Sequence, residues 1–244
     1  MSGDHESLEA LSGWALILGA SSGIGAATAK ELARRGMNIL GVHLDRRSTQ
    51  ASAEHVKAEI QAMGRQVELF NVNAADQEKR RQVVQHARQR LADNGGGPLR
   101  VLMHSLAFGT LVPFVGPSGG GVERRQMEMT LDVMAHSLVY WVQDLVEAGL
   151  LGEGSRVFAM TSEGSSRVWP GYGPVSAAKA ALESHVRQLA LELAPRGTTV
   201  NAILAGVTDT PALRKIPGHQ QMMEAARGRN PHGRLTRPED VAGA

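Results

Sequence analysis

The chain of 244 residues contains no cysteine, which excludes disulfide bonds, thiolate catalysis and cysteine metal sites. Long hydrophobic runs are also missing, since stretches such as "WALILGA" are far shorter than the roughly 20 apolar residues of a membrane span. The first residues, "MSGDHESLEALSG", lack the basic segment and apolar core of a signal peptide. We therefore expect no membrane association and a cytoplasmic location.

A strong charge of either sign is missing as well. Lysine and arginine number 26 and aspartate and glutamate 24, and the basic residues are scattered, so we expect no nucleic-acid-binding face. The 9 histidines show no metal-ligand spacing with carboxylates, and we expect no metal site.

Glycine is abundant, with 28 residues in a chain that is 42% hydrophobic and 4% aromatic. This composition and length are typical of a single α/β domain. Short apolar runs bounded by glycine alternate with helical periodicity, which indicates repeated βαβ units. We expect an α/β protein, a Rossmann-type doubly wound parallel sheet flanked by helices. Its single domain is predicted over residues 13–244, after a polar N-terminal extension over residues 1–12.

The expected elements follow from these patterns, with Gly36 and Gly64 as left-handed caps that end two helices. Strands are predicted at Ala15–Leu18, Asn38–Leu44, Gln66–Val72, Arg100–His104, Arg156–Thr161 and Thr199–Leu204. Helices are predicted at Gly25–Arg35, Thr49–Met63, Asp76–Ala92, Glu123–Ala148 and Val175–Leu193. The glycine clusters at Asn94 and Gly116 are predicted to be surface loops.

The first predicted strand runs directly into "GASSGIGAATAKELARRG". Gly19, Gly23 and Gly25 then lie at a strand-to-helix turn, where free amides and the positive end of the helix would face a pyrophosphate. A tight turn that uses glycine for steric reasons alone is the alternative, since the motif by itself is a weak signal.

A second motif, "GYGPVSAAKAALESHVRQLALELAP", holds Tyr172 and Lys179. Pro174 suits the first turn of a helix, so the helix that carries Lys179 should begin at about this proline, with Tyr172 just before it. The alternative for Tyr172 is a structural tyrosine that is buried and bonded to the backbone.

The glycine-rich turn with spacing G-x-x-x-G-x-G resembles the short-chain dehydrogenase/reductase family. Four further segments match that family in order: "HSLA", "MTSEGS", the segment with Tyr172 and Lys179, and "NAILAGVTDTPAL". The resemblance covers nearly the whole chain from Gly13 onward.

The pattern departs from most of the family at the tyrosine. The position four residues before Lys179 is Val175, and Tyr172 stands seven residues before the lysine. This spacing, "HSLA" and Met134 in place of the usual asparagine resemble the enoyl-acyl-carrier-protein reductases. The stretch "AAKAALESHVRQLALELAPRGTTVNAILAGVTDTPALRKIPG" looks most like their NADPH-dependent type III branch. That branch reduces a carbon–carbon double bond in fatty-acid synthesis.

The resemblance implies a catalytic role for Tyr172, Lys179 and Ser162. Tyr172 would hydrogen-bond the enolate oxygen of a trans-2-enoyl thioester, and the charge of Lys179 would favour the phenolate. Ser162 could alternatively be a turn residue that ends the fifth strand. The resemblance implies cofactor contacts from Gly19, Ser21, Ser22, Gly23, Ile24, Gly25, Asn71, Val72, Ser105, Leu106, Ala107, Lys179, Gly206, Val207, Thr208 and Thr210.

NADPH is the expected cofactor, and NADH is less favoured. His43 stands where NAD enzymes of the family carry an acidic residue, and Arg46 and Arg47 could bind a 2′-phosphate. Asp45 weakens this prediction, and two exposed arginines could equally belong to a solvated loop.

Phe108, Trp169 and Met222 are the candidates for lining the substrate site, although each could equally be a core residue. The segment Ala212–Gly218 and the residues after it are expected to close over the acyl chain. Arg214 and Lys215 near this opening could steer an acidic acyl-carrier protein.

The resemblance also implies a further helix and strand after "RPEDVAGA". We therefore expect a domain that is C-terminally truncated relative to the family, with a sheet that lacks the last strand. A homodimer or homotetramer is expected where the C-terminus is complete. Two alternative functions remain open: a carbonyl, 3-oxoacyl or quinone reductase of the same family, and a cofactor-binding protein without catalysis.

Overall fold

A six-stranded parallel sheet forms the centre of the protein, as seen in a computed structural model that describes residues 10–116 and 118–244. The strand order is β3-β2-β1-β4-β5-β6. This order confirms the predicted Rossmann-type doubly wound sheet. The strands are β1 (Trp14–Leu18), β2 (Asn38–His43), β3 (Val67–Asn71), β4 (Val101–His104), β5 (Arg156–Thr161) and β6 (Thr199–Leu204).

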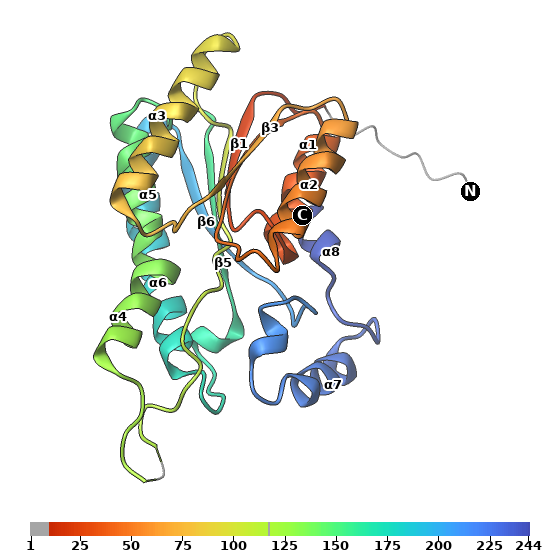
Figure 1. Cartoon of the computed structure of the whole chain (residues 1–244), viewed down its shortest axis with the longest axis vertical. Coiled ribbons are helices and arrows are strands. Elements are labelled where there is room, and N and C mark those ends of the chain that lie inside the picture. Colours follow the sequence, from red (N-terminus) through yellow and green to blue (C-terminus); the bar gives the residue numbers. More distant parts are fainter. Residues whose placement is uncertain (1–9, 117) are drawn as a thin grey trace, which may run out of the picture.

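Helices cover both faces of the sheet (Figure 1). One face packs against α3 (Gln77–Asp93), α5 (Ser137–Glu147) and α6 (Gly173–Leu193), and the other against α1 (Gly23–Arg34) and α2 (Gln50–Ala62). α4 (Arg124–Leu131) precedes α5, and α8 (Pro238–Ala242) packs against α1. α7 (His219–Arg229) has no buried residue and lies apart from these layers (Figure 1).

The strands are apolar because both faces of the sheet are covered. All five residues of β1 are buried, and β1 pairs with both β2 and β4 in parallel register. The carboxyl ends of the strands therefore meet at one edge of the sheet, between Leu18, His43 and His104. In doubly wound folds, this edge is where ligands bind.

The predicted helix over Glu123–Ala148 is interrupted in the structure. A π-helical segment at Asp132–His136 separates α4 from α5, and it contains the buried Met134. A π turn places one extra residue in the helix, and a sequence pattern with a 3.6-residue period does not reveal it. The single-helix prediction is wrong at this segment.

Two helices lie where no helix was predicted. They are α7 and α8, which follow β6. Leu11, in the predicted polar extension, donates its backbone N–H to Arg35 O at 2.8 Å and packs on the core beside α1. Residues 1–9 of that extension lie outside the described residues, as does Pro117 in the predicted loop at Gly116.

In the part of the chain that the structure describes, no helix has the length and apolar character needed to cross a bilayer.

Candidate active site

The glycine-rich turn between β1 and α1 depends on the small size of its residues. Gly19 has φ +93°, and a side chain there would overlap the backbone oxygen of Ser105 in the loop after β4. A side chain at Gly25 would overlap the backbone oxygen of Gly19. Gly23 has φ +56° and begins α1. The turn therefore packs tightly against the loop after β4.

The amino end of α1 is suited to an anion. Ser22 is the N-cap residue, yet its side chain makes no capping hydrogen bond, so the first-turn amides keep their donors. These amides, together with the positive end of the helix dipole, favour a phosphate group. The turn therefore fits the pyrophosphate of a dinucleotide, and it contains the predicted residues Ser21 and Ile24.

A hydrogen-bonded group joins the ends of β2 and β3 beside this turn. His43 Nδ1 lies 2.8 Å from Asp45 Oδ2, and Asn71 exchanges two hydrogen bonds with the backbone of Asp45, at 2.9 and 3.0 Å. Val72, also predicted at this end of the site, donates its N–H to His43 O. Burial raises the pKa of Asp45, but hydrogen bonds from Thr49 and Ser21 and the proximity of His43 outweigh it, so this pKa lies below its ordinary value. Asp45 is thus ionised at neutral pH and lies next to the glycine-rich turn.

Arg46 and Arg47 are exposed just beyond Asp45. The sequence pointed to these arginines as the anion-binding groups, and the structure adds the carboxylate of Asp45 next to them. Positively and negatively charged side chains therefore both lie at the end of the site where an adenosine would bind.

Tyr172 stands at the N-cap of α6, as the position of Pro174 predicted, and α6 begins at Gly173. The Tyr172 hydroxyl lies 3.4 Å from Ser162 Oγ, in the short 3-10 turn after β5. A side chain at Gly164 would overlap the Tyr172 ring, so this glycine makes room for the phenol. The structure thus brings the hydroxyl groups of Tyr172 and Ser162 together.

Phe114 lies on the other side of Tyr172. A Cβ at Gly173 would lie 2.6 Å from Phe114 Cζ, so the ring of Phe114 packs directly on this glycine. The loop that carries Phe114 follows β4, and sequence reasoning did not single it out. A glycine on either side of Tyr172 was the available signal, since such glycines allow another group to approach closely.

Lys179 is buried, and its Nζ donates hydrogen bonds to Met160 O at 2.7 Å and to Leu106 O at 3.5 Å. These carbonyls belong to the carboxyl end of β5 and to the loop after β4. Burial lowers the pKa of Lys179 to about 8, and the nearby charge of Glu183 opposes this effect. Lys179 is therefore cationic at neutral pH and begins to lose its proton near pH 8.

The protonation state of Tyr172 differs from the expectation that the charge of Lys179 would favour the phenolate. Burial raises the pKa of the Tyr172 phenol, and only the hydrogen bond with Ser162 opposes it. The Lys179 ammonium is bonded to the two backbone carbonyls rather than directed at the phenol. The phenol is consequently protonated, so Tyr172 is poised as a hydrogen-bond donor rather than a phenolate.

His104 ends β4 and is fully buried beside this group. Ser137 Oγ donates to Val133 O at 2.8 Å, so it accepts the hydrogen bond from His104 Nε2 at 2.9 Å. His104 Nδ1 is buried without a partner in the structure. Burial, together with the charge of Lys179, lowers the pKa of His104 to about 3, so the ring is neutral at physiological pH.

The remaining predicted cofactor residues lie in the loops after β4 and β6. A Cβ at Gly206 would overlap Thr236 Oγ1, and Thr208 forms an isolated parallel bridge with Thr236. The methyl group of Thr210 lies beside Gly23 in the glycine-rich turn. These contacts bring the loop after β6 to the amino end of α1. The other predicted residues in these loops are Ser105, Leu106, Ala107 and Val207.

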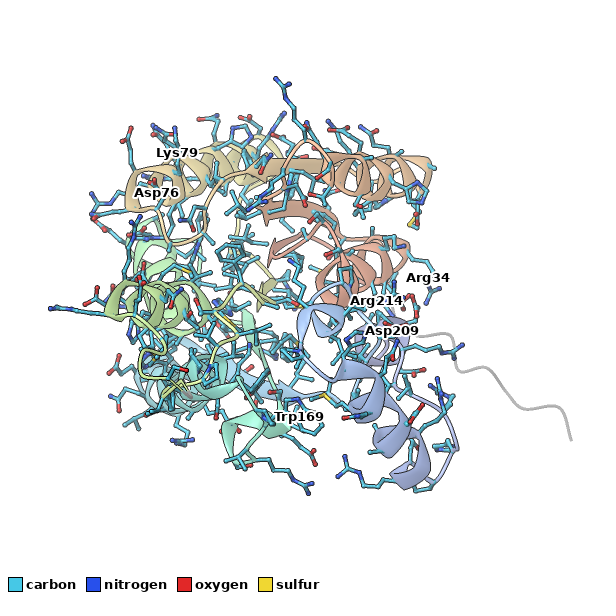
Figure 2. The ribbon with its side chains drawn as sticks, turned by 60° about the horizontal axis from the view of Figure 1, so that its bottom comes forward. Arg34, Asp76, Lys79, Trp169, Asp209 and Arg214 are labelled. Atoms are coloured by element: carbon cyan, nitrogen blue, oxygen red, sulfur yellow. The ribbon has the colours of Figure 1, made fainter. Side chains whose placement is uncertain are left out.

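The three predicted substrate-lining residues do not form one surface by direct contact. Trp169 donates from Nε1 to Pro217 O at 2.9 Å and packs on Gly218. It therefore connects the loop before α6 with the segment before α7 (Figure 2). Phe108 is 51% exposed after β4, and Met222 is half-buried on α7.

Arg214, predicted to attract a carrier protein, is already engaged. Its guanidinium makes two hydrogen bonds to the carboxylate of Asp209, at 2.8 and 3.0 Å, and the pair lies on the segment after β6 (Figure 2). This pairing neutralises most of its charge. Lys215, the neighbouring residue, is exposed.

Comparisons with known proteins match this chain to a family of reductases that act on several substrates. The family model described as "Enoyl-(Acyl carrier protein) reductase" matches residues 19–244. The NADH enoyl-acyl-carrier-protein reductase FabI of Aquifex aeolicus is 31% identical over 155 residues, which span 63% of this chain and 56% of that protein.

The 3-oxoacyl-acyl-carrier-protein reductase FabG of Pseudomonas aeruginosa is 30% identical over 245 residues, which span 93% of this chain and 86% of that protein. Among solved structures, a short-chain dehydrogenase of Burkholderia cenocepacia in complex with NADP superposes with a TM-score of 0.77 at 28% identity. That match covers 94% of this chain and 86% of the Burkholderia chain.

Proposed function

The chain belongs to the short-chain dehydrogenase/reductase family, and on that premise we propose that it is an NADPH-dependent enoyl-acyl-carrier-protein reductase. In this proposal it reduces the carbon–carbon double bond of trans-2-enoyl thioesters in fatty-acid biosynthesis. What the family membership itself supports is an NAD(P)-dependent reductase.

The placement of the phenol is the observation that carries the proposal. Val175, four residues before Lys179, is buried and packs near Gly109, so no hydroxyl stands at that position. The only other tyrosine, Tyr140, lies on α5, with the Arg80 guanidinium 5.4 Å from its ring centre. Tyr172 beside Ser162 is thus the phenol available at the site, set back from Lys179 by two helical turns.

This spacing suits an extended conjugated thioester. When bound, NADPH supplies the hydride for the β-carbon of the substrate. Tyr172, protonated and held by Ser162, donates a hydrogen bond to the thioester oxygen, on which negative charge develops. Lys179 would hold the nicotinamide ribose through its ammonium, and it contributes positive charge to the site.

The choice of NADPH rests on Arg46 and Arg47, whose guanidinium groups are exposed beside the glycine-rich turn. The complex of the Burkholderia relative with NADP supports it. Two observations favour NADH instead: the name of the Aquifex relative specifies NADH, and Asp45 is ionised. The balance between these charges is directly testable by binding.

An acyl-carrier protein is the proposed carrier of the substrate. Lys215 is the exposed basic residue near the opening, whereas Arg214 is paired with Asp209. Charge reversal at Lys215 should raise the KM for carrier-linked substrate and leave the KM for coenzyme A-linked substrate unchanged. Equal changes for both substrates would contradict this partner. A homodimer or homotetramer is proposed from the family resemblance.

A second candidate is a 3-oxoacyl reductase, which the match to the Pseudomonas relative over 93% of the chain favours. The test is to measure NADPH and NADH oxidation with crotonyl thioester and with acetoacetyl thioester. We expect activity with crotonyl thioester and a loss of at least tenfold in kcat for Tyr172→Phe.

Tyr140→Phe serves as the matched control, because Tyr140 lies outside the site, on α5. Activity with acetoacetyl thioester alone would establish the second candidate instead. Cofactor binding without turnover of either substrate would indicate a non-catalytic cofactor-binding protein.

A further inference from the structure

Glu183 lies behind the candidate active site, on α6, four residues after Lys179. Residues at this spacing share one face of a helix. The Thr161 hydroxyl donates a hydrogen bond to Glu183 Oε1 at 2.5 Å. Glu183 therefore faces the end of β5, as Lys179 does.

The two side chains hold consecutive residues of β5. Lys179 Nζ donates to Met160 O, and Glu183 accepts from the hydroxyl of Thr161, the next residue. Ser162, the neighbour of the Tyr172 hydroxyl, follows Thr161 directly. A shift of Thr161 would therefore move Ser162 relative to the phenol.

Glu183 also provides charge where the site needs it. Lys179 is only 6% exposed, and a buried ammonium without a nearby anion tends to lose its proton. Glu183 is the carboxylate whose charge opposes this loss. The other titratable residues on β4 and on the elements packed against α6 are His104, Arg124, Arg125, Glu128, Asp132, His136, Tyr140, Asp144, Glu147, Arg156, Glu163 and Tyr172.

Glu183 is the carboxylate whose charge raises the Lys179 pKa, whereas Asp132 lines a surface hollow with Arg125 and Glu128. His104 is neutral at physiological pH, because burial lowers its pKa to about 3. His136 is bonded to His185, at 3.0 Å between Nδ1 and Nε2. Glu163 is half-exposed and pairs with Arg167.

We propose that Glu183 is a positioning residue of the active site, which carries the counter-charge of Lys179 and fixes Thr161 so that Ser162 stays beside Tyr172. This inference rests on the roles proposed above for Lys179, Ser162 and Tyr172. It does not depend on which thioester is the substrate. A carboxylate that merely satisfies the Thr161 hydroxyl is the simpler account.

Titration of Lys179 separates the two accounts. The full chain is labelled with 13C at lysine Cε, the Lys179 resonance is assigned by its absence in Lys179→Arg, and its midpoint is followed with pH. Glu183→Gln keeps an oxygen acceptor for Thr161 but removes the charge. We expect its Lys179 midpoint to fall by about one pH unit, whereas Thr161→Val keeps the charge and should leave the midpoint nearly unchanged.

NADPH binding, followed by fluorescence, gives a second readout. Glu183→Gln should bind NADPH nearly as wild type does at pH 6.5 and about fivefold more weakly at pH 8, where wild-type Lys179 is still about half protonated and the variant's Lys179 has lost most of its proton. Glu183→Asp restores the charge on a shorter side chain and should recover at least half of the midpoint shift. If Glu183→Gln does not fold, Glu183→Ala is measured with the same expectation.

An unchanged Lys179 midpoint in Glu183→Gln or Glu183→Ala would contradict the proposal that Glu183 is the counter-charge of Lys179. An unchanged kcat in Thr161→Val would overturn the positioning of Ser162. These outcomes are separate from the proposed substrate. A wild-type protein that fails to reduce crotonyl thioester but shows the midpoint shift would refute the enoyl reductase assignment and leave the role of Glu183 intact.

Discussion

At the scale of single residues, Asp45 bears most directly on the choice of cofactor. Its carboxylate is ionised, is bonded to His43 and lies against Ser21 in the glycine-rich turn. A 2′-phosphate held by Arg46 and Arg47 would be close to this negative charge. Asp45 therefore opposes NADPH more than NADH, because only NADPH carries the phosphate.

We predict that Asp45→Asn strengthens NADPH binding by about fivefold, equivalent to roughly 1 kcal/mol, and changes NADH binding little. Fluorescence titration with both nucleotides measures the ratio. Asp93→Asn, at the carboxyl end of α3, is the control for a general change in net charge. An equal increase in affinity for both nucleotides would show that Asp45 does not distinguish a 2′-phosphate from a 2′-hydroxyl.

Gly164 is the residue that makes room for Tyr172. Because a Cβ there would overlap the ring, Gly164→Ala should displace the phenol from Ser162. We predict a loss of at least tenfold in kcat with NADPH affinity retained, since the glycine-rich turn is untouched. Gly152→Ala, where a Cβ would meet open space, is the matched control. Full activity in Gly164→Ala would mean that Tyr172 adapts without loss.

The positions of the candidate residues Tyr172, Lys179 and Ser162 follow from local motifs of the sequence. Pro174 determines where α6 begins, and this placed Tyr172 at the N-cap in advance. The partners Thr161, Glu183 and Phe114 were not predictable, because each contact joins segments that are distant in the chain. Only the folded structure brings these residues together.

At the scale of elements, Trp169 connects two segments that border the site. Its Nε1 donates to Pro217 O, and this contact adjoins α7, which has no buried residue of its own. α7 therefore depends on few contacts for its position, and such regions open locally at low cost in free energy.

We predict that Trp169→Phe increases amide hydrogen exchange over His219–Arg229 by several-fold, since about 1 kcal/mol of hydrogen bonding is lost. Exchange in β1 should be unchanged, because all of its residues are buried on both faces of the sheet. Trp14→Phe would be a poor control because it alters the core, so Phe108→Leu in the loop after β4 is preferred. Unaltered exchange over α7 would show that this hydrogen bond does not hold the helix.

The elements differed in how well the sequence predicted them. β1 to β6 were predicted within about two residues, because buried strands between glycines leave a clear apolar pattern. α7 was missed because it contains no buried residue and so has no apolar period to detect, and α8 was missed because its five residues are too few to show a period.

At the scale of the whole molecule, His104 links stability to pH. Its pKa is lowered from the ordinary value of 6.5 to about 3 in the folded protein, because burial and the charge of Lys179 disfavour the charged ring. The unfolded chain therefore binds more protons between these values, and stability must decrease as pH falls below 6.5. This contribution is fully present above pH 6.5.

We predict that the free energy of unfolding decreases by about 2 kcal/mol between pH 7 and pH 5 through His104 alone. Urea unfolding at both pH values measures it. His104→Gln, which keeps a donor for Ser137, should show a decrease smaller by this amount. The same decrease in the variant would assign the acid sensitivity to other groups.

The π segment at Asp132–His136 has a consequence for how this chain tolerates changes in length. A π turn contains one residue more than the α turn that could replace it, while the helices on either side keep their faces toward the sheet. Loss of a single codon there would let α4 and α5 join as one continuous helix. Elsewhere in these helices, the same loss would rotate every following side chain by about 100° away from the core.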